Sequence, residues 1–265
     1  MVSIQIQRRL FLLPIVSFIF LLASVFTTYG VAAGLGHVNP GFPYISYTGL
    51  KVPERGIFGQ LLNMGAILLA LNVCARYLRV KVYNTDVSCL NKTCLVLGLL
   101  SAFGQTMVAN FETVVMRGPH YVGAALGFGV GGIYCWIQTV LSWRLRHESR
   151  ITRHLVFWSQ LLISVLISVF AITFSVSKII FKGYKNDEAK NEEGPVRTAY
   201  LTSTVAEWLL AISIMFFLLT YVPEFRNVTV KPPCVECDSV GNVAGSNNRL
   251  DVDSKLMEKN GNSSV

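Results

Sequence analysis

Six apolar blocks, each about twenty residues long, constrain this sequence more than any other feature. They lie at about residues 10–33, 57–78, 93–115, 121–141, 155–177 and 200–222. A helix of roughly 20 residues crosses about 30 Å of hydrocarbon. A membrane β-barrel would instead alternate apolar and polar residues over strands of roughly ten residues. The blocks therefore predict an all-α fold, a polytopic membrane bundle of six transmembrane helices.

The composition agrees with this fold and excludes a soluble enzyme. Only 14% of the residues are charged, whereas soluble domains carry about 25%. The net charge is +8, but the 23 Lys and Arg residues are spread between the blocks and form no basic face. We therefore expect no nucleic-acid partner.

The first block has two interpretations. It follows Arg8 and Arg9, as a secretory signal peptide would, and residues 31–33 are small enough for a cleavage site. Its uncharged stretch is longer than the 7–15 residues of a typical signal core. We therefore expect it to be retained as the first helix of a six-helix domain over residues 1–222.

The short loops predict the orientation of the bundle. With the N-terminus in the cytoplasm, the loops after the second and fourth blocks are cytoplasmic and almost purely basic, as the positive-inside rule requires. Both termini are then cytoplasmic, as are the sequons at Asn91, Asn227 and Asn262, which we expect to be unmodified. Residues 223–265 are rich in Asn, Ser, Gly and charge, and predict a disordered cytoplasmic tail.

Small and polar residues within the blocks are the candidates for packing and function. Gly123, Gly127 and Gly131 recur at four-residue steps and predict a close-packed helix contact within the bundle. Glu207 and Glu112 are carboxylates within apolar blocks, and Asn110 is a further polar candidate. Such residues are either functional groups or structural anchors between helices. For Glu112 we favour an interfacial carboxylate that is paired with Arg117 or with water.

The sequence holds little that points to catalysis, a metal or a cofactor. Its four histidines lie at block edges, and no metalloprotease or serine-hydrolase motif is present. Cys234 and Cys237 form a lone CxxC in the predicted tail, without a second ligand pair. Cys89 and Cys94 stand beside a membrane end and are candidate palmitoylation sites. We expect a non-enzymatic protein.

Eight segments together form a recognisable pattern, which is specific in the loop after the first block and in the Glu-Trp pair of the last one. The segments are His37–Ser46, Thr48–Gly49, Val52–Phe58, Leu95–Leu100, Val108–Phe111, Ile137–Ser142, Ala206–Trp208 and Phe217–Tyr221. They resemble the damage-regulated autophagy modulator (DRAM) family, within the wider FRAG/DRAM/Sfk group. Two positions depart from the family pattern, because Tyr47 and Glu112 stand where the family usually has an acid and a Gln.

The resemblance implies a six-helix protein of lysosomal or endosomal membranes that promotes autophagy, by recruiting protein partners or organising lipid. The expected partners are membrane lipids and unidentified membrane or cytosolic proteins. One alternative is a proton-coupled transporter or lipid-handling protein that uses Glu207. Another is a plasma-membrane regulator of phosphoinositide kinase complexes. The predicted lumenal contact surface consists of Pro43, Tyr44, Ser46, Gly49, Pro53 and Glu54.

Overall fold

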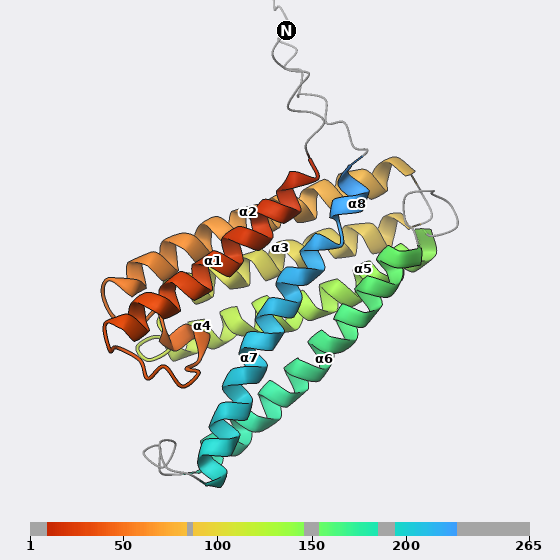
Figure 1. The fold of residues 1–265 in the computed structure, drawn as a ribbon. Helices are drawn as coiled ribbons and strands as arrows, with labels where there is room; N and C mark the ends of the chain where they lie inside the picture. The colour runs from red at the N-terminus through yellow and green to blue at the C-terminus, as the bar shows by residue number, and fades with distance from the viewer. Residues whose placement is uncertain (1–9, 84–86, 146–153, 185–193, 227–265) are drawn as a thin grey trace, which may run out of the picture. The chain divides into compact units, whose positions relative to one another are not determined.

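The computed structural model of the chain describes residues 10–83, 87–145, 154–184 and 194–226. These residues form helices joined by short connections, and the described part contains no strand (Figure 1). Beside the α-helices there is one short 3₁₀-helix, η2, and one π-helix, η3. The elements are α1 (Leu12–Gly34), η2 (Ile45–Tyr47), α2 (Glu54–Tyr83), α3 (Ser88–Asn110), α4 (Arg117–Ala124), η3 (Ala125–Val130), α5 (Gly131–Leu145), α6 (His154–Gly183), α7 (Pro195–Leu219) and α8 (Val222–Phe225).

Six spans in the described residues are long and apolar enough to cross a membrane, which confirms the predicted all-α bundle. Each span packs against its neighbour in the sequence, and α7 returns to pack against α1 as well as α6. The chain is therefore a multi-pass membrane protein. We call the end of the bundle with the start of α1 and with α8 the terminal end, and the opposite end the loop end.

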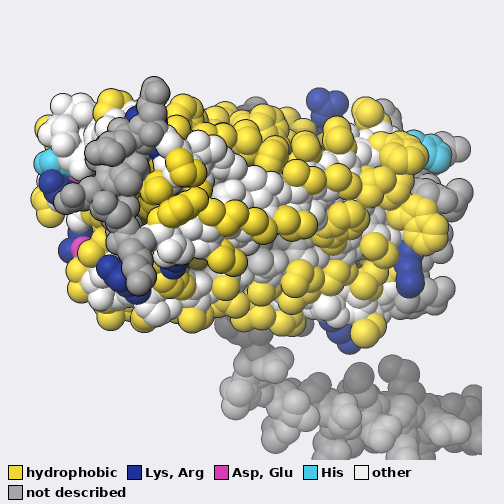
Figure 2. Space-filling model, turned by 90° about the horizontal axis from the view of Figure 1, so that it is seen from below, with side chains coloured by type: hydrophobic (Ala, Val, Ile, Leu, Met, Phe, Trp, Pro, Cys, Tyr) yellow, Lys and Arg dark blue, Asp and Glu magenta, His cyan; other side chains and the backbone are white. Residues whose placement is uncertain are grey.

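The outer surface of the bundle is apolar over its middle. Figure 2 shows a face on which hydrophobic side chains form a broad band, while Lys, Arg and His side chains gather toward the two ends. Large aliphatic residues point outward on several helices, including Ile67, Leu162 and Ile172, which are 58%, 62% and 65% exposed. Lipid tails can solvate such side chains, so this surface matches a bilayer.

The third span lies about five residues earlier than the sequence predicted. Its helix begins at Ser88 and ends at Asn110, and Phe111 is already extended. The predicted start at residue 93 left out a polar first turn. That turn is helical because Asn91 is buried and donates a hydrogen bond to the Tyr77 carbonyl of α2 at 3.0 Å.

The fourth span contains a π-helical segment, η3, between α4 and α5. The predicted glycine seam assumed an unbroken α-helix, in which four-residue steps stay on one face. The wider π turn breaks that register. A Cβ added at Gly127 would find its nearest neighbour at 3.9 Å, an ordinary contact. The backbone of Gly127 nevertheless lies against α3, because a Cβ at Gly104 would be 2.6 Å from the Gly127 nitrogen and the Ser101 hydroxyl donates to the Gly127 carbonyl at 3.1 Å. The contact with α3 therefore depends on the absence of a side chain at Gly104 more than at Gly127.

The tight contact of the fourth span is made by Gly123 with a glycine of α3. A Cβ at Gly123 would lie 2.6 Å from Met107 Cβ and 2.9 Å from the Gly104 carbonyl oxygen. A Cβ at Gly104 would lie 2.7 Å from the Gly123 oxygen, so each glycine allows the other helix to approach. At Gly131, a Cβ would lie 2.7 Å from the Ser101 hydroxyl.

The last span continues past the predicted start of the tail. Residues 222–225 form the short helix α8, in which Glu224 and Phe225 are both fully buried. The described chain extends to residue 226, so the boundary predicted at 223 was too early. Charge and a proline made this turn resemble a tail, but its side chains pack into the terminal end of the bundle.

Candidate functional site

The connection from α1 to α2, residues 35–53, folds over the loop end, and we call it the lid. Helix α1 ends in a Schellman motif. The N–H of His37 donates to the Ala32 carbonyl at 2.8 Å, and that of Gly36 donates to Ala33 at 3.1 Å. Gly36 has φ +69°, a conformation that favours glycine. This turn directs the chain back across the bundle toward α7.

Three hydrogen bonds fasten the lid to one face of α7. The Ile45 N–H donates to a Glu207 carboxylate oxygen at 2.9 Å, and Trp208 Nε1 donates to the Pro43 carbonyl at 2.9 Å. The Tyr44 and Ser203 hydroxyls are 2.5 Å apart. Glu207 and its neighbours therefore act on the backbone of the lid, and we call this set of contacts the lid clamp.

Glu207 is the buried acidic residue at the centre of the lid clamp. Its side chain is 5% exposed and interacts electrostatically with Lys178 of α6. The Lys178 ammonium also lies 4.6 Å from the ring centroid of Tyr44. Burial raises the pKa of the Tyr44 phenol above its usual value, so this hydroxyl stays protonated and can donate. The carboxylate thus has both a hydrogen-bond donor and a nearby cation.

Most residues predicted to form a lumenal contact surface point inward instead. Pro43, Tyr44, Gly49 and Glu54 are buried, Ser46 is half-buried, and Pro53 is exposed. The lid satisfies the polar groups of α7 and covers its aromatic side chains, so its inner residues are unavailable to a partner. The prediction of a surface from these six residues was wrong for the four buried ones.

Glu54, the first residue of α2, fastens the lid at a second place by contacting His37 of the lid. It is 1% exposed, and its Oε1 lies 2.5 Å from Nδ1 of His37, which follows the Schellman turn. This contact joins the end of α1 to the start of α2. Gly49 packs on Phe58 of α2, where an added Cβ would lie 2.6 Å from the ring.

Glu112 and Asn110 lie at the loop end of α3, outside the lid clamp. Glu112 follows the helix and forms an ion pair with Arg55 at the start of α2, in place of the predicted partner Arg117. It is not an intramembrane carboxylate, because α3 ends at Asn110. Asn110 exchanges two hydrogen bonds with Asn63 of α2, at 3.0 and 3.1 Å. Both residues join α2 to α3.

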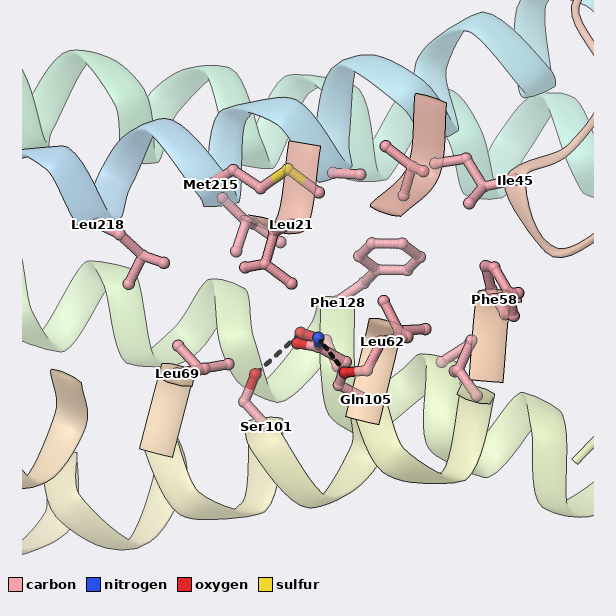
Figure 3. Close-up of a pocket in the computed structure, with 16 residues that line it drawn as sticks. Leu21, Ile45, Phe58, Leu62, Leu69, Ser101, Gln105, Phe128, Met215 and Leu218 are labelled. Atoms are coloured by element: carbon pink, nitrogen blue, oxygen red, sulfur yellow. Dashed lines mark hydrogen bonds between the residues drawn. The ribbon is translucent and has the colours of Figure 1, made fainter. Parts of the chain in front are cut away.

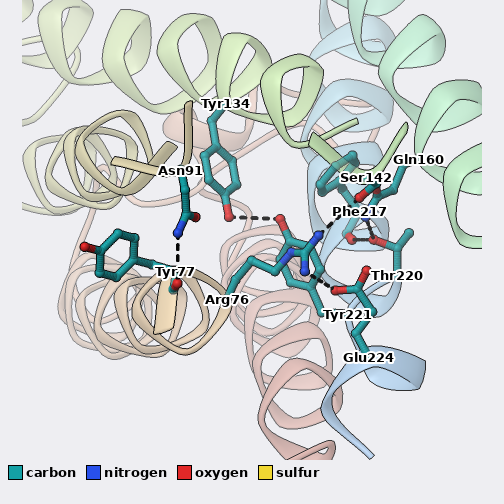
Figure 4. A network of polar contacts seen from close by, with 10 residues as sticks. All are labelled: Arg76, Tyr77, Asn91, Tyr134, Ser142, Gln160, Phe217, Thr220, Tyr221 and Glu224. Carbon is teal, nitrogen blue, oxygen red and sulfur yellow. Dashed lines mark hydrogen bonds and ion pairs between the residues drawn. The ribbon is translucent and has the colours of Figure 1, made fainter. Parts of the chain in front are cut away.

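A second polar cluster is buried at the terminal end (Figure 4). Arg76 is 1% exposed, and its Nη1 lies 2.7 Å from Oε2 of Glu224, which is fully buried. Arg76 Nη2 also donates to the Ser142 hydroxyl at 3.2 Å, and the guanidinium lies 5.7 Å from the Tyr221 ring centroid. The Tyr221 and Tyr134 hydroxyls are 2.9 Å apart. This cluster joins α2, α5, α7 and α8.

Hydropathy does not reveal this cluster, because Arg76 stands near the end of the second apolar block and Glu224 lies within the residues predicted as tail. The available signal was the position of Arg76 inside an apolar block, because an arginine within a span is a functional candidate by default.

The cysteines and sequons fall in different environments. Cys89 is exposed, whereas Cys94 is 1% exposed within the bundle and therefore cannot accept an acyl chain in the folded protein. Asn91 is buried, so its glycosylation state does not report orientation. Asn227, Asn262 and the CxxC lie outside the described residues.

Within the described ranges, no three His, Cys, Asp or Glu side chains gather in a way that would hold a metal ion.

Comparison with known proteins agrees with this architecture. The domain family described as "Frag1/DRAM/Sfk1/Cwh43P N-terminal domain" matches residues 9–228. The chain is 34% identical to DNA damage-regulated autophagy modulator protein 2 of Bos taurus, over 85% of this chain and 87% of the relative. It is 33% identical to DNA damage-regulated autophagy modulator protein 1 of Homo sapiens, over 79% of this chain and 88% of the relative. No solved structure matches the chain. The match across all six spans shows that this protein belongs to the Frag1/DRAM/Sfk1 family.

Proposed function

We propose that this protein modulates autophagy from the lysosomal or endosomal membrane and performs no chemical reaction of its own. The similarity over all six spans to relatives that are named autophagy modulators carries this proposal. In the proposed orientation, both termini are cytoplasmic and the lid faces the lumen. The protein acts by presenting its cytoplasmic segments to partners and by organising nearby lipid.

Two features of the bundle support a scaffold. The lid clamp fixes the loop end, and the Arg76–Glu224 cluster fixes the terminal end. Both polar clusters join helices of the same chain, Glu207 to the lid and Arg76 to Ser142 and Glu224. A scaffold of this kind holds its surfaces in one arrangement without a reaction centre.

The test is rescue in cells that lack the protein. Wild-type protein, Glu207→Gln and Glu207→Leu are expressed at matched levels, and autophagic flux is measured as marker turnover with and without a lysosomal inhibitor. The same cells are imaged against lysosomal and plasma-membrane markers. We expect wild type and Glu207→Gln to restore flux from lysosomes, and Glu207→Leu to lose abundance because the Ile45 N–H has no partner. Full flux without the protein, or residence at the plasma membrane, would contradict the proposal.

A proton-coupled function has one supporting observation, the buried Glu207 carboxylate near Lys178. The same rescue separates the two functions. A glutamine accepts the hydrogen bond from Ile45 but cannot titrate. Glu207→Gln protein that is abundant and correctly located yet inactive would favour proton coupling over the scaffold.

A further inference from the structure

An apolar cavity of about 110 Å³ lies in the middle of the bundle, beneath Ile45 of the lid (Figure 3). Its walls come from α1, α2, α3, the π-helical segment and α7. The two polar side chains in its lining already donate to backbone carbonyls, Ser101 to Gly127 at 3.1 Å and Gln105 to Leu62 at 3.0 Å. The cavity therefore suits an apolar occupant better than water, which needs two to four polar partners.

The cavity faces the bilayer on one side. Its lining residues on α1 and α2 are buried. The half-buried lining residues are Gln105 and Val108 on α3, Ala124 at the end of α4, Gly127 and Phe128 on the π-helical segment, and Ile214 on α7. The cavity therefore opens on the side that α3, the π-helical segment and α7 line. In a membrane, the apolar groups beside such an opening are acyl chains.

Two lysines of α6 lie between this opening and the loop end of the bundle. Phe128 lines the cavity and contacts the ring of Phe174, with centroids 6.5 Å apart. The Lys178 ammonium lies 4.6 Å from the Phe174 centroid, and Lys182 donates to the Tyr121 hydroxyl at 3.3 Å. Both lysines belong to the last two turns of α6 before Gly183, at the depth where a span meets the headgroups.

We propose that the bundle binds one anionic phospholipid, with the end of an acyl chain in the cavity and the phosphate near Lys178 and Lys182. The apolar walls select the chain, and the ammonium groups select the negative headgroup. Lys178 also faces Glu207, so its charge is shared with the lid clamp. Lys182 is exposed and is the cleaner contact to test. This inference is independent of the membrane in which the protein resides.

The experiment uses full-length protein in vesicles that contain phosphatidylglycerol with a photoreactive group at the end of one acyl chain. After irradiation, the labelled residues are mapped by mass spectrometry. We expect labelling to concentrate on residues 101–108, 124–128 and 211–218. Labelling spread evenly over outward-facing residues such as Ile67 and Ile172 would overturn the proposal, and this result needs no variant.

Two leucine substitutions in the same π-helical segment form a matched pair. A Cβ at Gly127 meets only an ordinary contact at 3.9 Å, so Gly127→Leu can place its side chain in the cavity. A Cβ at Gly129 has no neighbour within 4 Å, and Gly129 does not line the cavity. We expect Gly127→Leu to reduce cavity labelling at least fivefold and Gly129→Leu to leave it unchanged. Equal labelling of Gly127→Leu and wild type, at equal thermal stability, would refute the cavity as the site.

The headgroup is tested with Lys182→Gln and a phosphatidylcholine probe that carries the same chain. We expect wild type to prefer the anionic probe at least threefold, and Lys182→Gln to remove most of that preference while the mapped residues stay the same. Equal labelling of wild type by both probes would overturn the headgroup assignment.

Discussion

Removing one partner of the buried Arg76–Glu224 pair should strongly destabilise the protein. Arg76 is 1% exposed and Glu224 is fully buried, with the charged atoms 2.7 Å apart. Arg76→Met leaves Glu224 with its weaker cationic neighbour, the buried Arg79, and removing one partner of a buried pair costs about 3–5 kcal/mol. At about 2–4 °C per kcal/mol for a chain of this size, Arg76→Met should lower the unfolding midpoint by roughly 6–20 °C.

A double-mutant cycle separates the pair from its surroundings. Glu224→Leu alone should cost more than Arg76→Met, because Glu224 also interacts with the buried Arg79. The double variant should lose less than the sum of the two single losses, because the pair is counted in both of them. The assay is the fraction of protein that stays monodisperse in detergent after heating. Arg144→Met removes an exposed arginine at the same end and serves as the control, with an expected loss below about 0.5 kcal/mol. A loss below about 1 kcal/mol for Arg76→Met would match an exposed ion pair and refute the reasoning.

Three further outcomes are expected. Gly123→Leu should reduce cellular abundance severalfold, because its Cβ would lie 2.9 Å from a carbonyl oxygen of α3. Normal abundance of this variant would refute the assignment of a tight helix contact at Gly123. Glu207→Leu should make the lid more sensitive to limited proteolysis, since an unpaired Ile45 N–H costs about 1–3 kcal/mol, whereas unchanged cleavage would show that the hydrogen bond does not hold the lid. Cys89 should react with a maleimide in the folded protein and Cys94 only after denaturation, so rapid labelling of Cys94 would contradict its burial.

Hydropathy alone predicts the number and type of the spans, because bilayer thickness imposes a length that six blocks satisfy. It fails at the ends of helices, where polar side chains continue a span by bonding to a neighbouring helix. Asn91 starts α3 in this way, and Glu224 extends the last span through Arg76. Hydropathy averaged over a sequence window assigns both residues to loops, because the average does not include the residues of other helices that they contact.

The candidate site was predictable only in part. Glu207 was identified because a carboxylate in an apolar block needs a partner, but its partner is a backbone N–H of a distant loop. Nearly every residue has a backbone N–H, so the sequence does not show which one pairs with a given carboxylate. The π turn is likewise a local change of helical register that the sequence does not reveal, and it makes Gly127 part of the cavity wall as well as of the contact with α3.

The contacts of the lid also impose an order on biosynthesis. The lid is translated directly after the first helix, whereas Ser203, Glu207 and Trp208 belong to the last membrane span. Until that span is inserted, the Ile45 N–H and the Pro43 carbonyl lack these native partners. A nascent chain that stops before α7 therefore has only the contacts of the lid with α1 and α2, such as His37–Glu54. Insertion of the final helix is the step that completes the contacts of a loop made near the beginning of synthesis.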